Sequence, residues 1–274
     1  MLRDWLRARL RPAKPSPRPH VPLPWVPHRP EAWTLAFHPT FLAAAGDPDR
    51  LVALARPVHP GLWILPVLDP VWCEALRDEV VAYRAWAARA GVRVEAPNSM
   101  NRYGLILDGA REGDEAQNPP LLDLAPLRQA LLPLTARLFP EVGGAALDDH
   151  HGFVVSYALE GDRALDFHAD DAEVTLNLCL GGGFAGGDLW FEGRRCLRHL
   201  DAPTRPEEHV IYAHTPGVAL LHAGAHRHGA HAITAGRREN LILWMRAGGL
   251  RAAHDPALGF GDACPPWCAG EPRR

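Results

Sequence analysis

Lysine is almost absent from this chain of 274 residues. Lys14 is the only one, and all the other strongly basic side chains are arginines. Because alanine, proline and glycine are abundant, this bias indicates a coding preference rather than a phosphate-binding surface. The formal net charge is −3, so the chain has no overall positive field that would attract nucleic acid or an acidic membrane. We therefore expect neither as a partner.

Long hydrophobic runs are also missing. No stretch has the roughly 20 apolar residues that a transmembrane helix needs. Residues 1–30, which are rich in proline and arginine, lack the apolar core of a secretory signal peptide. We expect residues 1–30 to form a flexible lead-in and the protein to be cytoplasmic.

Cysteine is scarce and scattered, which excludes the disulfide framework of a small secreted domain. The five cysteines are Cys73, Cys179, Cys196, Cys264 and Cys268. Only Cys264 and Cys268, in "CPPWC", lie close in sequence, and such a pair can bind a metal or form a disulfide. Since no second pair completes a zinc site, we expect free thiols in a reducing compartment.

Helical patterns come first along the chain. Residues 61–91 predict a short strand and then a helix, with Asp69 as N-cap, Pro70 at the first position and a glycine after the last turn. Residues 119–144 also have helical apolar spacing. We expect Pro133 to bend or split that second helix.

From residue 150 the apolar pattern changes to short runs separated by glycines and acids. These runs are residues 152–161, 172–183, 186–193, 208–214, 216–224 and 238–249. Their spacing indicates antiparallel strands in a sandwich or barrel. With 47% hydrophobic residues the chain can bury a sizeable core. We expect an α+β protein in which a barrel, residues 150–250, follows a helical part, residues 31–149, and precedes a tail, residues 251–274.

The stretch "LDFHADDAEVTLNLCL" places His168 and Asp170 one residue apart, directly before a strand-like run. On an extended segment these two side chains point the same way. A non-haem ferrous oxygenase needs two imidazoles and one carboxylate on one face of the metal. The second histidine must then come from a strand distant in sequence. The candidates are His222, His226, His228 and His231.

The position of a downstream arginine indicates which of these four histidines is the metal ligand. A dicarboxylate cosubstrate that chelates iron extends its far carboxylate away from the metal, where a guanidinium can bind it with two hydrogen bonds. Arg238 lies ten positions after His228 on the last predicted strand, which favours His228. Arg237 is the rival of Arg238. Neighbouring side chains on one strand point to opposite faces, so only one of them can enter the barrel.

Taken in order, these motifs resemble a known family. The set of His168-x-Asp170, "TLNLCL", a histidine–glycine pair at His228 and a Gly-x-Arg ending at Arg238 is similar to the prolyl-4-hydroxylase-like branch of the 2-oxoglutarate and iron(II)-dependent oxygenases. Four longer stretches resemble the family named 2-oxoglutarate and iron-dependent oxygenase domain-containing protein 2. They are "MNRYGLIL", "HGFVVSYALEGDRALDFHADDAEVTLNLCL", "FAGGDLWFEG" and "LLHAGAHRHGAHAITAGRRENLILWMR". The resemblance covers roughly residues 95–250.

The resemblance implies a double-stranded β-helix, a jelly-roll or cupin-like barrel, with iron(II) held by His168, Asp170 and His228 and 2-oxoglutarate held by Arg238. It implies a dioxygenase that uses O2 to convert 2-oxoglutarate to succinate and CO2 and hydroxylates a C–H bond. The substrate is then a protein side chain, an amino acid or another small molecule, and ascorbate is an optional reductant. Asp170 argues against a halogenase, which lacks a carboxylate at this position.

Two further residues are candidates for contact with the cosubstrate. Tyr157 lies eleven residues before His168, where related enzymes carry a tyrosine that reaches 2-oxoglutarate. The alternative for Tyr157 is a core residue with a satisfied hydroxyl. Asn177 sits in a strand where a buried amide needs partners, so it either faces the cosubstrate or braces the barrel.

Other polar side chains have plainer interpretations. We expect His222 to pack at a strand end, and His226 and His231 to lie in a solvated loop. The stretch "MNRYG" puts Asn101 and Tyr103 either at the barrel mouth or in an ordinary loop.

Two other functions stay open at this stage. One is a cupin-type metal enzyme that does not use 2-oxoglutarate, against which Arg238 argues. The other is a catalytically silent jelly roll that binds a partner, against which the intact ligand set argues. The sequence leaves the substrate and the oligomeric state open.

Overall fold

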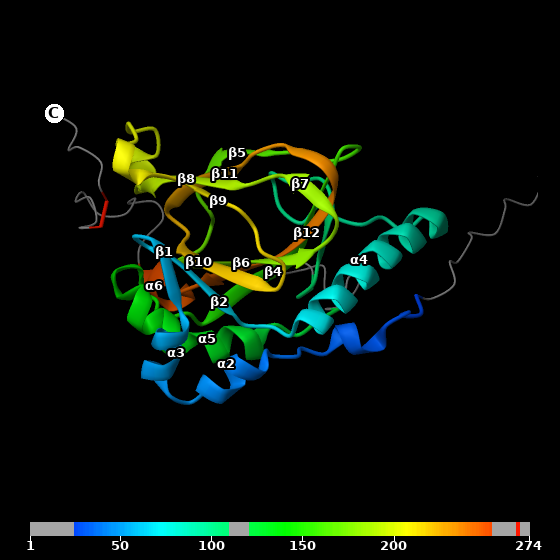
Figure 1. The fold of residues 1–274 in the computed structure, drawn as a ribbon, viewed down its shortest axis with the longest axis horizontal. Helices are drawn as coiled ribbons and strands as arrows, with labels where there is room; N and C mark the ends of the chain where they lie inside the picture. Colours follow the sequence, from blue (N-terminus) through cyan, green and yellow to red (C-terminus); the bar gives the residue numbers. More distant parts are fainter. Residues whose placement is uncertain (1–24, 110–120, 254–266, 269–274) are drawn as a thin grey trace, which may run out of the picture.

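The computed structural model describes residues 25–109, 121–253 and 267–268 (Figure 1). Most of the expected lead-in, residues 1–24, lies outside the described residues, and so does most of the predicted tail, including Cys264. Within the described ranges, none of the helices combines the length and the apolar composition that crossing a membrane requires.

Two antiparallel sheets form the centre of the molecule. Their strands are β1 (Arg56–His59), β2 (Leu62–Pro66), β3 (Gly104–Ile106), β4 (Asp149–Ala158), β5 (Leu165–His168), β6 (Val174–Gly181), β7 (Phe184–Gly186), β8 (Leu189–Arg194), β9 (His209–Tyr212), β10 (Val218–Ala223), β11 (His226–Ala230) and β12 (Ile233–Arg246). The larger sheet has the order β1-β2-β10-β6-β12-β4-β3, and the smaller one the order β5-β11-β8-β9. From β4 onward the chain crosses repeatedly between the two sheets. This is the winding of a double-stranded β-helix, so the predicted fold is confirmed.

The N-terminal part of the chain contributes strands as well as helices. β2 pairs with β10 at one edge of the larger sheet, and β3 pairs with β4 at the other edge. The sequence predicted β2 but not β1 or β3, which are short and carry few alternating apolar residues. These three strands widen the larger sheet beyond the barrel strands.

Most of the helices cover one face of the larger sheet (Figure 1). These are η1 (Pro30–Trp33), α2 (Pro39–Ala44), α3 (Pro48–Leu54), α4 (Pro70–Ala90), α5 (Ala125–Leu138), η2 (Pro140–Val142) and α6 (Gly248–Ala253). Two short helices, η3 (Leu197–His199) and η4 (Pro206–Glu208), lie beside the smaller sheet. α4 has the predicted ends: Oδ1 of Asp69 accepts hydrogen bonds from the N–H groups of Val71 and Trp72, and Gly91 takes the left-handed φ of 68°. α5 continues through Pro133 as one helix rather than two.

β6 shows how period-2 alternation directs side chains to the two faces of the sheet. Leu176, Leu178 and Leu180 belong to the apolar core that the helices cover. Thr175 and Asn177, which alternate with these leucines along the strand, line a pocket on the opposite face. The helices therefore bury the outer face of the larger sheet, and the opposite face lines a pocket of mixed polar and apolar side chains.

Candidate metal centre

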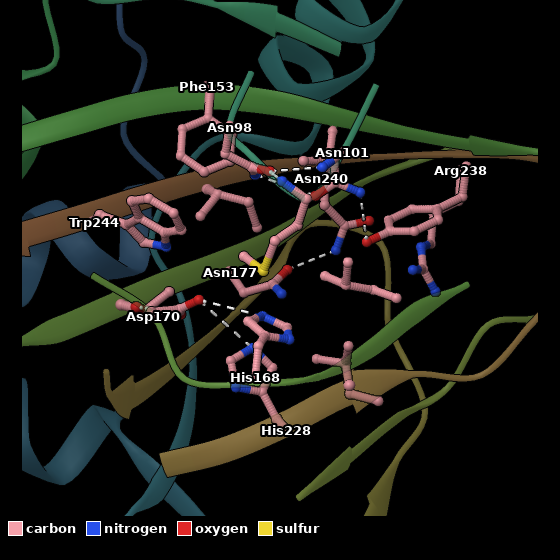
Figure 2. A pocket seen from close by; sticks show the side chains of 18 residues that line it. Asn98, Asn101, Phe153, His168, Asp170, Asn177, His228, Arg238, Asn240 and Trp244 are labelled. Carbon is pink, nitrogen blue, oxygen red and sulfur yellow. Dashed lines mark hydrogen bonds and ion pairs between the residues drawn. The ribbon is translucent and has the colours of Figure 1, made fainter. Parts of the chain in front are cut away.

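Three side chains with metal-ligand atoms meet inside the barrel (Figure 2). His168 ends β5, Asp170 follows two residues later, and His228 lies on β11 opposite His168. Nε2 of His168 is 3.4 Å from Oδ1 of Asp170, and Nε2 of His228 is 3.9 Å from the same oxygen. The ligand atoms of the three residues lie within 4.8 Å of one another. The structure thus brings together the three residues that the sequence singled out.

Backbone carbonyls fix the orientation of both imidazoles. Nδ1 of His168 lies 2.8 Å from the carbonyl oxygen of Asp166, and Nδ1 of His228 lies 2.9 Å from that of His226. A carbonyl oxygen can only accept, so Nδ1 carries the hydrogen in each ring. In the neutral imidazole, Nε2 then presents its lone pair to the space beside Asp170, which is the arrangement that metal-binding histidines adopt.

The carboxylate of Asp170 is buried and well supported, with its side chain 4% exposed. The Thr175 hydroxyl donates to Oδ2 at 2.6 Å, and Nε2 of His222 lies 3.8 Å from that oxygen. Burial alone would raise the pKa of Asp170, but the neighbouring His228, His168 and His222 outweigh it and lower that pKa overall. Asp170 therefore offers an ionised carboxylate.

The two histidines differ in their response to burial. Burial, reinforced by the charge of His168, lowers the pKa of His228 to about 3, so this ring stays neutral. Burial also acts to lower the pKa of His168, but the hydrogen bond and charge of Asp170 raise it above 6.5 overall. Protonation therefore competes with a metal ion at His168 at a higher pH than at His228.

Arg238 lies elsewhere in the same pocket, away from the three ligand residues (Figure 2). It is 1% exposed and sits on β12 directly opposite Tyr157 of β4. Its guanidinium carbon is 4.7 Å from the centre of the Tyr157 ring and 5.6 Å from that of Phe184. Nη1 donates to the carbonyl of Gly187, whereas Nε has no hydrogen-bond partner among the described residues. A buried guanidinium with a donor to spare fits an anionic ligand.

Two amide pairs complete the polar part of the pocket. Nδ2 of Asn240 donates to Oδ1 of Asn177 at 2.6 Å, and Nδ2 of Asn101 lies 3.4 Å from the hydroxyl of Tyr157. Burial raises the pKa of Tyr157, which therefore keeps its proton. Tyr157 and Asn177, the two candidates for contact with the cosubstrate, thus lie in the pocket with Arg238.

The sequence reasoning missed Asn240 and Asn98, which also line the pocket. For Asn240 the signal was present, because it follows Arg238 by two residues and shares its face of the strand. Every second residue onward, Ile242 and Trp244, lines the pocket as well. Asn98 had no such pattern, since it lies in a loop before β3.

Two residue pairs that the sequence left open differ in whether they face the pocket: Arg238 and Asn101 line it, whereas Arg237 and Tyr103 do not. The Arg237 side chain is 43% exposed and pairs with Glu239 at 2.5 Å, so Arg238 is the arginine that enters the barrel. Asn101 is 2% exposed and faces the pocket, whereas Tyr103 is 39% exposed and does not line it.

One prediction about the histidines is wrong. His226 was expected in a solvated loop, but it lies on β11, is 2% exposed and packs 5.1 Å from the ring of Phe191. β11 has only five residues and contains a glycine, so its sequence shows no alternation of apolar and polar residues that would predict a strand. His231 is exposed, as expected, and His222 packs at the end of β10.

The donor set fits ferrous iron. Two neutral imidazole nitrogens and one carboxylate on one side of a site form the set of non-haem iron(II) oxygenases. The unpaired Nε of buried Arg238 fits one carboxylate of a dicarboxylic acid. The residues present therefore match both iron(II) and 2-oxoglutarate.

Comparisons with known proteins agree with this chemistry. The family model of the OGFOD2-like domain matches residues 27–144, a range that ends before the ligand residues. The 2-oxoglutarate and iron-dependent oxygenase domain-containing protein CP2 of Arabidopsis thaliana is 38% identical over 233 residues, which cover 84% of this chain and 57% of that protein. The human 2-oxoglutarate and iron-dependent oxygenase domain-containing protein 2 is 35% identical over 260 residues, covering 86% of this chain and 70% of that protein.

Solved structures are more distant. A prolyl hydroxylase from Trichoplax adhaerens, in complex with a hypoxia inducible factor peptide fragment, has a TM-score of 0.48 and 18% sequence identity. That match covers 76% of this chain and 94% of the Trichoplax chain.

The chain spans little more than half the length of several of its sequence relatives. It covers 57% of each of the two Arabidopsis proteins and 53% of the Xenopus tropicalis protein.

Proposed function

Since this chain belongs to the family of 2-oxoglutarate and iron-dependent oxygenase domain-containing protein 2, we propose that it is a 2-oxoglutarate- and iron(II)-dependent dioxygenase. The observation that carries the proposal is the pairing, in one pocket, of the His168, Asp170 and His228 ligand atoms with the buried guanidinium of Arg238. The three ligand atoms suit the metal, and the guanidinium suits the cosubstrate.

Each residue has a role in this reaction. His168, Asp170 and His228 hold the iron, and Arg238 binds the far carboxylate of 2-oxoglutarate, with Tyr157 packed against the guanidinium. Iron(II) and O2, when bound, supply the oxidation that converts 2-oxoglutarate to succinate and CO2 and puts the second oxygen atom into a C–H bond of the substrate. Ascorbate serves as an optional reductant for the iron.

The remaining pocket residues orient the ligands and exclude water. Thr175 holds one oxygen of Asp170 at 2.6 Å, which leaves the other oxygen for the metal. Phe191 stacks on His228 with a ring-centre distance of 5.2 Å and keeps that imidazole in place. Burial of this kind strengthens the electrostatic attraction between Arg238 and a carboxylate.

We propose an amino-acid-type substrate, in a protein or free. Met100, Phe153 and Trp244 give the pocket an apolar wall, and Asn98 and Asn101 add amide groups beside it. An aliphatic side chain with polar backbone groups on either side suits this combination. Neither nucleic acid nor a membrane is included among the proposed partners, because the net charge of −3 provides no field for them. The cytoplasm is the proposed compartment, on the basis of the scattered cysteines.

Succinate formation tests the proposed function. The purified chain is incubated with iron(II), 2-oxoglutarate and cell extract under ¹⁸O-labelled dioxygen, and products are followed by mass spectrometry. The proposal expects succinate that depends on 2-oxoglutarate and a product that gains one labelled oxygen. Metal-dependent turnover without 2-oxoglutarate would instead favour the cupin-type enzyme. Absence of turnover, with iron and 2-oxoglutarate both unbound, would favour the silent binding module.

A further inference from the structure

A second cluster of metal-ligand side chains lies away from the iron pocket. Cys196 directly precedes η3, the short helix that follows β8, and His199 ends it, whereas Cys268 lies in the short described segment near the C-terminus. Figure 1 shows the two segments, yellow and red, at the same end of the molecule. The ligand atoms of the three residues are within 4.8 Å of one another.

The distances within this cluster match those between ligands of one zinc ion. Sγ of Cys196 lies 3.3 Å from Nδ1 of His199, and Sγ of Cys268 lies 3.6 Å from the same nitrogen. Zinc binds sulfur at about 2.3 Å and nitrogen at about 2.0–2.1 Å, so a tetrahedral angle separates the two ligand atoms by about 3.6 Å. The backbone N–H of Cys196 also donates to Sγ of Cys268 at 3.3 Å, a bond that stabilises a thiolate.

Two buried arginines hold the loop that carries this cluster. Arg227, 1% exposed, donates to the carbonyl oxygens of Leu200 at 2.9 Å and Ala202 at 2.6 Å. Arg195, 2% exposed, forms two hydrogen bonds to the carboxylate of Glu208, at 2.8 and 2.7 Å. The loop backbone after His199 is therefore held by contacts within the protein, which lowers the entropic cost of binding a metal there.

This cluster bears on the metal-binding alternative left open for "CPPWC". The sequence offers no second cysteine pair, but the fold brings Cys196 and His199, spaced Cys-x-x-His, next to Cys268. Thiolate and imidazole ligands favour zinc over the hard cations that prefer oxygen. Cys264 precedes Cys268 by four residues and lies outside the described residues.

We propose that Cys196, His199 and Cys268 bind a structural zinc ion that ties the C-terminal segment to the loop after β8. The ion is separate from the iron site: Phe191 of β8 pairs with the ligand His228, and Cys196 lies five residues further along, up to about 16 Å for an extended chain. The zinc site does not depend on the proposed oxygenase activity. Its role is to fix a segment near the chain end, as structural zinc does in small domains.

The donor atoms allow the two metal sites to be told apart in one and the same chain. The iron site offers nitrogen and oxygen, whereas the second site offers sulfur and nitrogen. Cobalt(II) in the second site gives a thiolate-to-metal charge-transfer band in the near ultraviolet, which the iron site cannot give. The probe is therefore cobalt(II) added to metal-free protein whose iron site carries His168→Ala and Asp170→Ala.

We expect this protein to develop the thiolate band with about one equivalent of cobalt and to lose it when zinc is added. Cys196→Ser and Cys268→Ser should each lower the zinc affinity more than about a hundredfold, since losing even an outer hydrogen-bond partner of a ligand costs 10–100-fold. Cys73→Ala is the matched control, because Cys73 is a buried cysteine of α4 outside the cluster. It should leave the band and the zinc content unchanged.

A measurement on the unmodified chain covers the case in which a serine variant does not fold. With zinc bound, Cys196 and Cys268 should resist alkylation, and chelation should expose both to the reagent, as peptide mapping would show. Three results would overturn the proposal. They are a cobalt complex without a thiolate band, stoichiometric zinc that survives in both serine variants, and a Cys196–Cys268 disulfide in protein purified without oxidant.

Discussion

His168 and His228 lie directly opposite each other on β5 and β11, with ring centres 4.2 Å apart. The register of the ladder therefore sets the distance between the two imidazoles. A slip of one residue in β11 would bring Arg227 or Gly229 to the inner face in place of His228. Backbone pairing, rather than contact between the side chains, brings the two nitrogen ligands together.

The first prediction concerns these ligands. Anaerobic addition of iron(II) and 2-oxoglutarate should give a weak visible charge-transfer band, and His168→Ala or Asp170→Ala should abolish it, because each removes one of three ligands. The measurement is an absorbance titration. His226→Ala is the control: His226 is buried beside Phe191 but offers no ligand, so the band should persist while the melting temperature falls. A band that survives in both ligand variants would remove these residues from the site.

The second prediction separates Arg238 from Arg237. Arg238→Ala leaves a buried carboxylate of the cosubstrate without its partner, a loss of about 3–5 kcal/mol. The 2-oxoglutarate requirement should rise at least a hundredfold, since about 1.4 kcal/mol corresponds to tenfold. Iron binding should remain, and Arg238→Lys should recover only part of the loss, because an ammonium lacks the planar fork. Succinate formation across 2-oxoglutarate concentrations measures these effects.

Arg237→Ala is the matched control, and we expect it to lower the stability of the protein rather than to change its 2-oxoglutarate requirement. Its side chain is 43% exposed and pairs with Glu239, which is 1% exposed. The melting temperature should fall, because Glu239 is left buried without this partner. The 2-oxoglutarate requirement should change by less than about threefold, the scale of an exposed charge. A large rise in the requirement for Arg237→Ala would mean that the wrong arginine is assigned to the cosubstrate.

The parts of the molecule that the sequence predicted are those with a local signal. Asp69 and Pro70 mark the start of α4 through a cap that acts over three residues. His168 and Asp170 share a face because they are two residues apart on an extended segment. Each of these predictions rests on residues close together in sequence, so it does not depend on which strands pair.

The parts that the sequence did not predict depend on long-range pairing. His226 is buried because β11 lies between β5 and β8, and five residues with a glycine give no alternation to reveal that position. Cys268 meets Cys196 across a sequence separation of 72 residues. Contacts of this kind arise from tertiary structure, which local patterns do not record.

The third prediction concerns Asn177. Its Oδ1 already accepts a hydrogen bond from Asn240 at 2.6 Å, which leaves the amide N–H groups for a ligand. If Asn177 donates to 2-oxoglutarate, Asn177→Ala loses a hydrogen bond to a charged group, about 1.5–3 kcal/mol. The 2-oxoglutarate requirement should then rise about tenfold or more. A lower melting temperature with an unchanged requirement would show that Asn177 only braces the barrel.

The last prediction concerns the pair of Arg195 and Glu208 and its dependence on pH. The hydrogen bonds from Arg195 lower the pKa of Glu208, although partial burial acts to raise it. Because the folded pKa lies below the ordinary value of 4.5, the stabilisation is complete above that pH and is lost as the pH falls through the folded pKa. Glu208→Gln leaves the Arg195 guanidinium, whose side chain is 1% exposed, without its charged partner.

At pH 7 this substitution should cost about 3 kcal/mol, the lower end for breaking a buried pair, because Glu208 itself is 14% exposed. The melting temperature should fall by roughly 5–10 °C for a chain of this size. The difference between the wild type and Glu208→Gln should shrink as the pH falls through the lowered folded pKa of Glu208, where the wild-type carboxylate also becomes neutral. Glu207→Gln, at the exposed neighbouring position, is the control and should shift the melting temperature little at any pH. Thermal melts of the three proteins between pH 3 and pH 7 measure the effect, and a constant difference across that range would contradict the proposed charge pairing.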